Sequence, residues 1–487
     1  MRLRVKTLAP IFSALLVCIA SFAIFQTTLR GNDATSAVSS GVLFLASVLF
    51  ARYILQIPFA SGAMGYLILL GLFHLGLIVP WALGIYDISR APSFSPHGLS
   101  RSITLINYSV IAFDLGLVLA LFVAKKPANV LRQPAATDPE NHEVYIAGCL
   151  LLAAGIVMFI VGLIGLDPLG YFRLTYSETF RLRAESDPRL FGSGITVSFI
   201  GLSIAAAGAS QKRFRAVAII GAVWLISLMY WGFRGPALIA AIVVYIIARK
   251  KGLHVPKWAP LLALTTALLI LPVLRSGRES PLNERFSQLS FKDFNILDGP
   301  AEMGMSIRPL LETIDLIGPD DFRWGKTYWI GMQGIVPNLA LRWESSASPR
   351  EDDLPPNHWI TAMVDPWSYK NYGGMGFSAI AEPYMNFGLA GVIAYFIFLA
   401  YFMIWLEQLS VRNSYALAAW ALILGPLLWT TRNDFSNFFR SAVWGLLTLA
   451  AVKAISVAYA NVLDKSHPHP ARLTSRLQRV KHVEPAQ

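Results

Sequence analysis

The feature that most constrains this chain is a series of long apolar runs with almost no charge. Residues 261–274 and 390–406 contain no Asp, Glu, Lys, Arg or His, and with their flanks they reach the ~20 residues that a helix needs to cross a bilayer. Only 14% of the 487 residues are charged, against about 25% in a soluble domain. The runs therefore predict an all-α, polytopic integral membrane protein.

The apolar runs predict about twelve transmembrane helices. They cover residues 8–28, 34–55, 62–84, 103–124, 144–165, 191–209, 214–231, 235–249, 257–274, 379–406, 413–430 and 441–463. The first begins like a signal peptide but continues through Phe25 without a convincing small-x-small cleavage site, so we expect it to be retained. The predicted organisation is spans 1–9 in residues 1–274, a large loop in 275–378, spans 10–12 in 379–463 and a basic tail in 464–487.

Basic side chains then predict the orientation. Lys and Arg gather in residues 1–6, 125–132, 212–215, 249–251 and 464–487. Alternation through twelve spans puts all of them on one side, as the cytoplasmic face of a membrane protein requires. Both termini are therefore expected in the cytoplasm and the 275–378 loop outside. Topology explains much of the +12 net charge, and no zinc-ligand spacing or RNA-binding signature occurs. We expect no nucleic-acid partner, no metal and no cofactor.

The 275–378 loop is predicted to be a folded cap. It holds fourteen acidic and ten basic residues, and residues 301–317 and 328–341 have the apolar spacing of helices. Across the whole outer face we count seventeen arginines against three lysines, whereas the inner loops carry eleven and nine. Arginine binds phosphate with two parallel hydrogen bonds, so the bias indicates an anionic ligand. For any single arginine the alternative is an interfacial anchor.

Charged side chains stand at several predicted outer membrane edges. They are Arg234 in the turn 231–236, Arg275 and Arg278 where the ninth span ends, Arg432, Asp434 and Arg440 in residues 431–440, and Glu382 at the head of the tenth span. An ionisable group at the depth of Glu382 is a functional-site hypothesis by default. The amides of Gly376 and Ser378 precede the same helix and suit an oxyanion.

One segment resembles a known family. Gly374-x-Gly376-Phe377-Ser378-x-x-Ala381-Glu382-x-Tyr384-x-Asn386-Phe387-Gly388-x-x-Gly391 resembles the oligosaccharide repeat-unit (O-antigen, Wzy-type) polymerases. The Arg234-Gly235 turn and Arg432-Asn433-Asp434 with Arg440 support it, as do a dozen spans with one large loop, an arrangement similar to GT-C-like polymerases and ligases. The resemblance implies a glycosyltransferase of the bacterial inner membrane.

The implied reaction moves the growing glycan from undecaprenyl diphosphate to the non-reducing end of an incoming lipid-linked repeat unit at the periplasmic face. The product would be O-antigen, capsule or exopolysaccharide, and a chain-length regulator and a flippase would be partners. Such a reaction needs cations for the leaving diphosphate and a base for the attacking hydroxyl. We assign Arg234, Arg432 and Arg440 to the diphosphate, with Arg275 and Arg278 as weaker candidates. Glu382, then Asp434, then His358 are candidate bases, and Gly374, Gly376, Ser378, Tyr384 and Asn386 are assigned to substrate binding.

Several alternatives stay open. Glu382 has a purely structural interpretation, as a salt bridge or cap that holds the tenth helix, and His358 has one as a turn cap. His74 and Asp114 are expected to pair at similar depth, with a proton pathway as the alternative. The cap tryptophans Trp324, Trp329, Trp343, Trp359 and Trp367 suit either sugar stacking or core packing. An O-antigen ligase with the same donor and a lipid-linked oligosaccharide flippase are the competing functions.

Overall fold

The computed structural model describes residues 33–91, 98–123, 141–165, 189–253, 295–318, 321–336, 353–370 and 374–466, with a few isolated positions between them. All regular structure in these ranges is helical, which confirms the all-α prediction. The predicted spans 8–28 and 257–274, together with Arg275, Arg278 and Trp343, lie outside the described residues.

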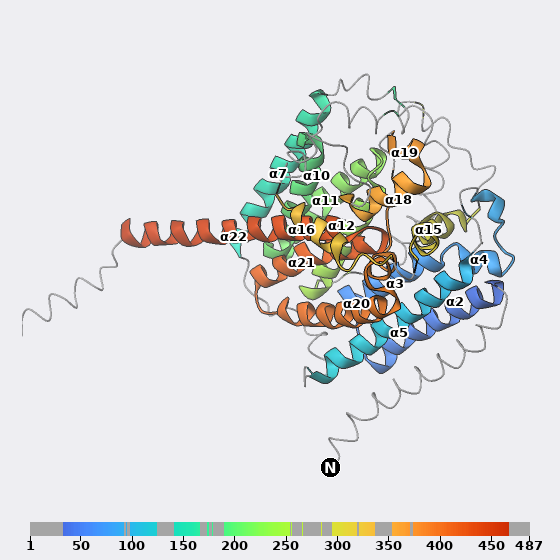
Figure 1. Ribbon diagram of the computed structural model, residues 1–487. Coiled ribbons are helices and arrows are strands. Elements are labelled where there is room, and N and C mark those ends of the chain that lie inside the picture. Colours follow the sequence, from blue (N-terminus) through green and yellow to red (C-terminus); the bar gives the residue numbers. More distant parts are fainter. Residues whose placement is uncertain are drawn as a thin grey trace, which may run out of the picture.

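The helices of the predicted membrane spans form one bundle (Figure 1). They are α2 (Asp33–Leu49, continued by the π-helical turn η1, Phe50–Ile54), α3 (Gly62–Leu75), α4 (Ile78–Ala82), α5 (Leu99–Val123), α7 (His142–Gly165), α10 (Arg189–Gly208), α11 (Gln211–Tyr230), α12 (Arg234–Lys250), α20 (Ala381–Leu409), α21 (Ser414–Trp429) and α22 (Phe435–Ser466). Eight helical segments of the described chain are long and apolar enough to cross a membrane. The protein is therefore a multi-pass membrane protein. The predicted span at 62–84 is divided into α3 and α4, and the one at 235–249 is the 17-residue α12.

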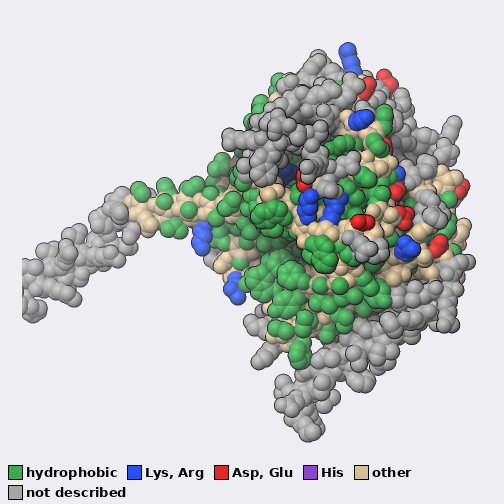
Figure 2. All heavy atoms as spheres, viewed as in Figure 1, with side chains coloured by type: hydrophobic (Ala, Val, Ile, Leu, Met, Phe, Trp, Pro, Cys, Tyr) green, Lys and Arg blue, Asp and Glu red, His purple; other side chains and the backbone are tan. Residues whose placement is uncertain are grey.

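Short helices fill the interval between α12 and α20 in the chain. They are α14 (Asp298–Gly304), η3 (Met305–Ile307), α15 (Arg308–Leu316), α16 (Lys326–Gln333), α18 (Pro356–Val364) and α19 (Pro366–Lys370), and we call them the cap helices. They contact the ends of α3, α5, α20 and α22. Figure 2 shows hydrophobic side chains over the face of α20, α21 and α22, with basic side chains gathered where this face borders the cap helices.

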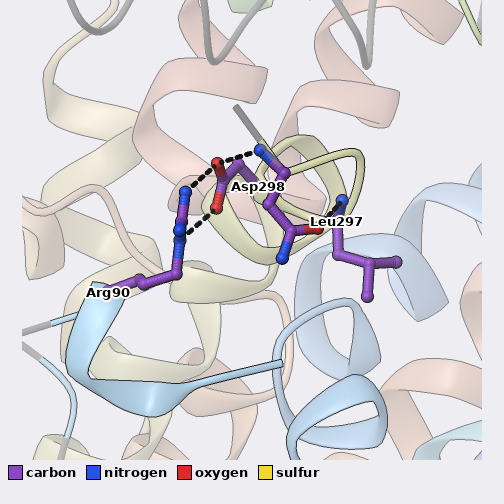
Figure 3. Close-up of polar contacts among 4 residues, drawn as sticks. Arg90, Leu297 and Asp298 are labelled. Carbon is purple, nitrogen blue, oxygen red and sulfur yellow. Dashed lines mark hydrogen bonds and ion pairs between the residues drawn. The ribbon is translucent and has the colours of Figure 1, made fainter. Parts of the chain in front are cut away.

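An ion pair ties the loop after α4 to the cap helices. In the short helix η2 (Ile88–Arg90), the guanidinium of Arg90 donates to both carboxylate oxygens of Asp298, at 3.1 and 2.8 Å (Figure 3). The backbone N–H of Asn295 donates to the same carboxylate at 3.1 Å. This arginine of the predicted outer face therefore has a structural partner, and a count of arginines overstates how many face a ligand.

Glycines at heptad spacing allow α7 and α10 to lie in close contact. Gly148, Gly155 and Gly162 of α7 lie against the backbone of Ala205, Ser198 and Phe191 of α10, and Gly194, Gly201 and Gly208 of α10 lie against the backbone of Phe159, Leu152 and Tyr145 of α7. A Cβ added to Gly148 or Gly201 would lie 2.1 or 2.2 Å from a backbone nitrogen of the other helix. Close approach through small residues is how membrane helices gain packing energy in lipid, where the hydrophobic effect does not bring them together.

A buried ion pair and its contacts join four helices at the end of the bundle away from the cap helices. Lys250 Nζ, at the end of α12, lies 3.3 Å from Glu407 Oε1 near the end of α20, and both side chains are almost fully buried. The ammonium also lies 4.8 Å from the ring centroid of Trp420 in α21. The Gly62 amide donates to the same carboxylate oxygen. Because an isolated buried charge is very unfavourable, each partner holds the other in place.

Candidate active site

The glycine-rich segment folds into a tight, buried turn that begins α20. Gly376 has a φ of +74°, a conformation that glycine adopts without strain. The next amide, of Phe377, donates to the carbonyl of Arg432 at 2.9 Å. The Ser378 hydroxyl accepts from the amides of Ile380 and Ala381 at 3.1 and 3.4 Å, as an N-cap does. The amides of Phe377, Ile380 and Ala381 therefore bind the chain's own oxygens, whereas the assignment of the Gly376 and Ser378 amides to an oxyanion stays a prediction.

His74 belongs to this turn, and its predicted pairing with Asp114 is wrong. His74 Nε2 lies 2.8 Å from Ser378 Oγ, and Nδ1 lies 2.9 Å from the Leu70 carbonyl oxygen. A carbonyl only accepts, so Nδ1 carries a proton and, in the neutral ring, the serine hydroxyl donates to Nε2. Asp114 instead accepts from Ser47 Oγ at 2.8 Å, across the α2–α5 contact. Similar depth in the membrane had suggested the pair, but the two side chains point to different neighbours.

Glu382 joins three elements through its carboxylate. One oxygen accepts from Thr327 Oγ1 of α16 at 2.9 Å, and the other from the Phe435 amide at the start of α22 at 2.7 Å. The residue is 4% exposed. Burial, followed by the charge of Glu382, raises the pKa of the nearby Tyr328 well above its ordinary value. Both carboxylate oxygens are thus engaged in holding helix ends together.

Asn386 extends this connection into the loop before α16. Its Nδ2 donates to Thr327 Oγ1 at 2.7 Å and to the Glu382 carbonyl at 2.9 Å. Its Oδ1 accepts from the Gly325 amide at 2.9 Å, and its carbonyl from the Trp324 amide at 3.1 Å. We call the side chains of Glu382, Asn386 and Thr327 the clamp. The clamp fixes the loop 322–325 against the first turns of α20.

A break in the helical conformation of α20 provides space for the loop 322–325. Gly388 has φ +62° and ψ −152°, which lies outside the helical region. A Cβ there would lie 2.8 Å from the Phe322 ring. The same ring meets Tyr384 edge-on, with 6.1 Å between centroids. Glycine is therefore needed at 388 both for the backbone conformation and for the space that Phe322 fills.

Asp434 caps α22 and reaches the cap helices. One carboxylate oxygen accepts from Ser436 Oγ at 2.6 Å and from the Asn437 amide at 3.2 Å. The other accepts from the Asn357 amide of α18 at 3.1 Å. The side chain is fully buried and lies close enough to Glu382 to interact with it electrostatically. The positive end of the α22 dipole stabilises the two neighbouring carboxylates.

Helix α18 lies over these elements. The Met375 amide donates to Thr361 Oγ1 at 3.2 Å, so α18 also contacts the turn before α20. Trp359 is 4% exposed, which assigns it to packing, and the Arg323 guanidinium lies 4.4 Å from its ring centroid. His358, the residue before Trp359, is exposed, with the centroid of its ring 6.3 Å from that of Tyr369. Candidate chemistry on α18 therefore centres on His358.

The structure brings two of the predicted arginine segments together. A Cβ on Gly235 would lie 2.3 Å from the Trp429 ring, so the start of α12 contacts the end of α21. Arg234 precedes that glycine, and Arg432 ends the 3₁₀ turn η5 (Thr430–Arg432) that follows Trp429. Arg440 is exposed on α22, one turn beyond its capped start. Gly374 is also exposed, and a Cβ there would meet no atom within 4 Å.

Sequence reasoning did not single out Arg323. Its backbone amide donates to the Met385 carbonyl at 3.0 Å, which ties it to the motif helix, and its guanidinium stacks on Trp359. The sequence counted it only among the arginines of the cap. The detectable signal was the Phe322-Arg323-Trp324-Gly325 string, with a cation between aromatics before a glycine turn.

Comparison with known proteins decides the family. The family model for the O-antigen polysaccharide polymerase Wzy matches residues 10–460, nearly the whole chain. The chain belongs to this family. No curated protein and no solved structure matches it. Membership makes the protein a membrane glycosyltransferase of polysaccharide biosynthesis, which polymerises repeat units and acts on lipid-linked oligosaccharide in the membrane. The resemblance inferred from the motif before α20 is confirmed, whereas the role of each site residue stays a prediction.

Proposed function

We propose that the protein extends a glycan that is held on undecaprenyl diphosphate. A hydroxyl oxygen at the non-reducing end of the incoming lipid-linked repeat unit attacks the anomeric carbon of the growing glycan. The bond from that carbon to the diphosphate oxygen breaks, the lipid diphosphate leaves with the electron pair, and the hydroxyl proton passes to a base. The family match over residues 10–460 carries this proposal.

Arginine-bearing segments that meet at one end of the bundle suit the leaving diphosphate. Arg234 and Arg432 stand on elements in contact, Arg440 follows on α22, and Arg323 lies beside α18. Cations held in place before the reaction stabilise developing diphosphate charge without reorganisation. We assign all four to the diphosphate, and Arg275 and Arg278 stay candidates.

The carboxylates and the histidine take different roles. Glu382 and Asp434 are buried and bonded to Thr327, Phe435, Asn357 and the start of α22, which suits positioning. His358 is exposed on α18, beside the packed Trp359, and we assign it as the base that accepts the hydroxyl proton. This reverses the order in which sequence reasoning ranked the three residues, because their burial depends on contacts between distant segments.

Location and partners complete the proposal. We place the cap helices at the periplasmic face of the inner membrane and both termini in the cytoplasm, on the distribution of Lys and Arg. The products we propose are O-antigen, capsule or exopolysaccharide, with a flippase that supplies repeat units and a chain-length regulator.

Reconstitution tests the proposed function. Purified protein in liposomes with the host's lipid-linked repeat units should produce a ladder of lipid-linked chains, and His358→Ala should abolish the ladder while the protein still inserts and folds. Deletion of the gene in the host should leave single lipid-linked repeat units. Accumulation of long lipid-linked polymer in the deletion strain would favour a ligase instead, and failure of the wild-type protein to form any ladder would refute the polymerase.

A further inference from the structure

Trp324 combines two properties that rarely occur together. Its φ is +48°, and within the described part of the chain Gln56 is the other non-glycine residue with positive φ. Its side chain is also 76% exposed. A left-handed conformation is unfavourable for a residue with a Cβ, and it persists only where surrounding contacts enforce it. The strained conformation therefore does not serve to bury the indole.

The contacts that enforce the conformation come from the motif of α20. The Trp324 amide donates to the Asn386 carbonyl, and the following Gly325 amide donates to Asn386 Oδ1. Within the clamp, Thr327 binds the side chain of Asn386, and the Phe322 ring fills the space beside Gly388. The family motif thus constrains the loop on both sides of Trp324, and the result is an indole that stands outside the protein.

Aromatic neighbours orient the indole. The Trp324 ring meets the Phe322 and Phe387 rings at steep angles, with centroids 6.5 and 6.3 Å apart. The tryptophans of the cap differ in exposure, because Trp359 is buried whereas Trp324, Trp329 and Trp367 are exposed. Among these three exposed tryptophans, Trp324 alone has a positive φ. A flat, exposed aromatic face is suited to the C–H face of a sugar ring.

Exposed charged side chains flank Trp324 in the chain. Asp321 and Lys326 are exposed on either side, and Lys326 Nζ pairs with Asp353 Oδ1 at 2.9 Å with 44% and 54% of the side chains exposed. Charged groups of this kind favour a hydrated, polar ligand over an acyl chain. The preceding residue, Arg323, stacks on Trp359 of α18, so the indole borders the proposed site.

We propose that Trp324 is a substrate-binding residue that stacks on a sugar ring of the lipid-linked repeat unit, and that the motif of α20 holds it in place. The inference rests on the proposed function and adds a sugar subsite next to the diphosphate arginines. It explains why the clamp and Gly388 constrain a loop whose most prominent side chain is not buried.

Substitution by glycine separates the side chain from its backbone strain. Trp324→Gly removes the indole and relieves the positive φ, so the melting temperature in detergent should hold or rise. In proteoliposomes the KM for the lipid-linked repeat unit should rise about two- to tenfold, the range that aromatic contacts give, with kcat nearly unchanged. Trp324→Phe should keep most of the affinity. Gln56→Gly relieves strain elsewhere in the chain, and Trp329→Ala removes another exposed indole; both should keep the wild-type KM.

Two inhibitors identify what the indole binds. The delipidated repeat-unit oligosaccharide should inhibit Trp324→Gly more weakly than the wild type, whereas undecaprenyl phosphate should inhibit both equally. A wild-type KM in Trp324→Gly overturns the inference. So does a result in which undecaprenyl phosphate inhibits Trp324→Gly more weakly than the wild type while the oligosaccharide inhibits both equally, because the indole would then contact the lipid. If Trp324→Gly misfolds, Trp324→Asn provides the same comparison, because asparagine tolerates positive φ. Wild-type protein without any chain extension would instead refute the proposed function.

Discussion

The substitution Thr327→Val tests whether Glu382 acts as a clamp or as a base. Valine keeps the shape of threonine and removes only its hydroxyl. That hydroxyl is fully buried, donates to Glu382 Oε1 at 2.9 Å and accepts from Asn386 Nδ2 at 2.7 Å. The substitution leaves the carboxylate of Glu382 in the protein, so any effect on catalysis must come from a change in the position of the elements that this carboxylate joins.

The structure sets the size of the expected effect. A hydrogen bond to a charged group contributes about 1.5–3 kcal/mol and a neutral one about 1 kcal/mol. Thr327→Val should therefore destabilise the protein by about 2–4 kcal/mol, since both bonds are lost and a buried Asn386 N–H loses a partner. Thr327→Ser retains the hydroxyl and removes one methyl group, which costs about 1 kcal/mol.

Thermal unfolding in detergent and chain extension in proteoliposomes measure the two consequences. We expect Thr327→Val to lower both melting temperature and extension, Thr327→Ser to lower them slightly, and Glu382→Gln to resemble the valine variant. The double variant Thr327→Val/Glu382→Gln should lose less than the sum, because the two changes remove the same bond. If Thr327→Val behaves as wild type while Glu382→Gln abolishes extension at an unchanged melting temperature, the clamp is refuted and Glu382 acts on the substrate itself.

Three further predictions concern other parts of the molecule. Gly201→Ala should destabilise the α7–α10 contact by about 1–3 kcal/mol, because its Cβ would lie 2.2 Å from a backbone nitrogen, whereas Gly192→Ala on the same helix meets open space and should melt as wild type. Lys250→Met should cost about 3–5 kcal/mol by leaving the Glu407 carboxylate buried without its cation, and adding Glu407→Gln should restore part of the melting temperature. Arg323→Ala should reduce extension at least tenfold and Arg323→Lys should recover only a fraction, because lysine lacks the planar fork; equal activity of both variants and wild type would remove it from the site.

Part of the site was predictable because sequence chemistry is local. The motif before α20 specified a glycine turn, a helix start and a glutamate at that start, and the structure has all three. The role of the glutamate was not predictable, because its partners Thr327 and Phe435 lie 55 and 53 residues away. The sequence kept both a base and a structural interpretation open for Glu382, and the structure provides the hydrogen bonds for the second. His74 shows the same limit, since its partner Ser378 is 304 residues away.

The sequence by itself determined that the chain crosses the membrane repeatedly, because a run of apolar residues is stable in hydrocarbon whatever its neighbours are. It also indicated the family, through a motif whose residues lie within one short segment, 374–391. Only the tertiary structure decided which helices touch, which arginines are already paired and which tryptophans are exposed. Those outcomes depend on side chains that meet across long sequence separations, such as Arg90 with Asp298, and on close backbone contacts that only glycine permits. Local composition carries no information about such contacts.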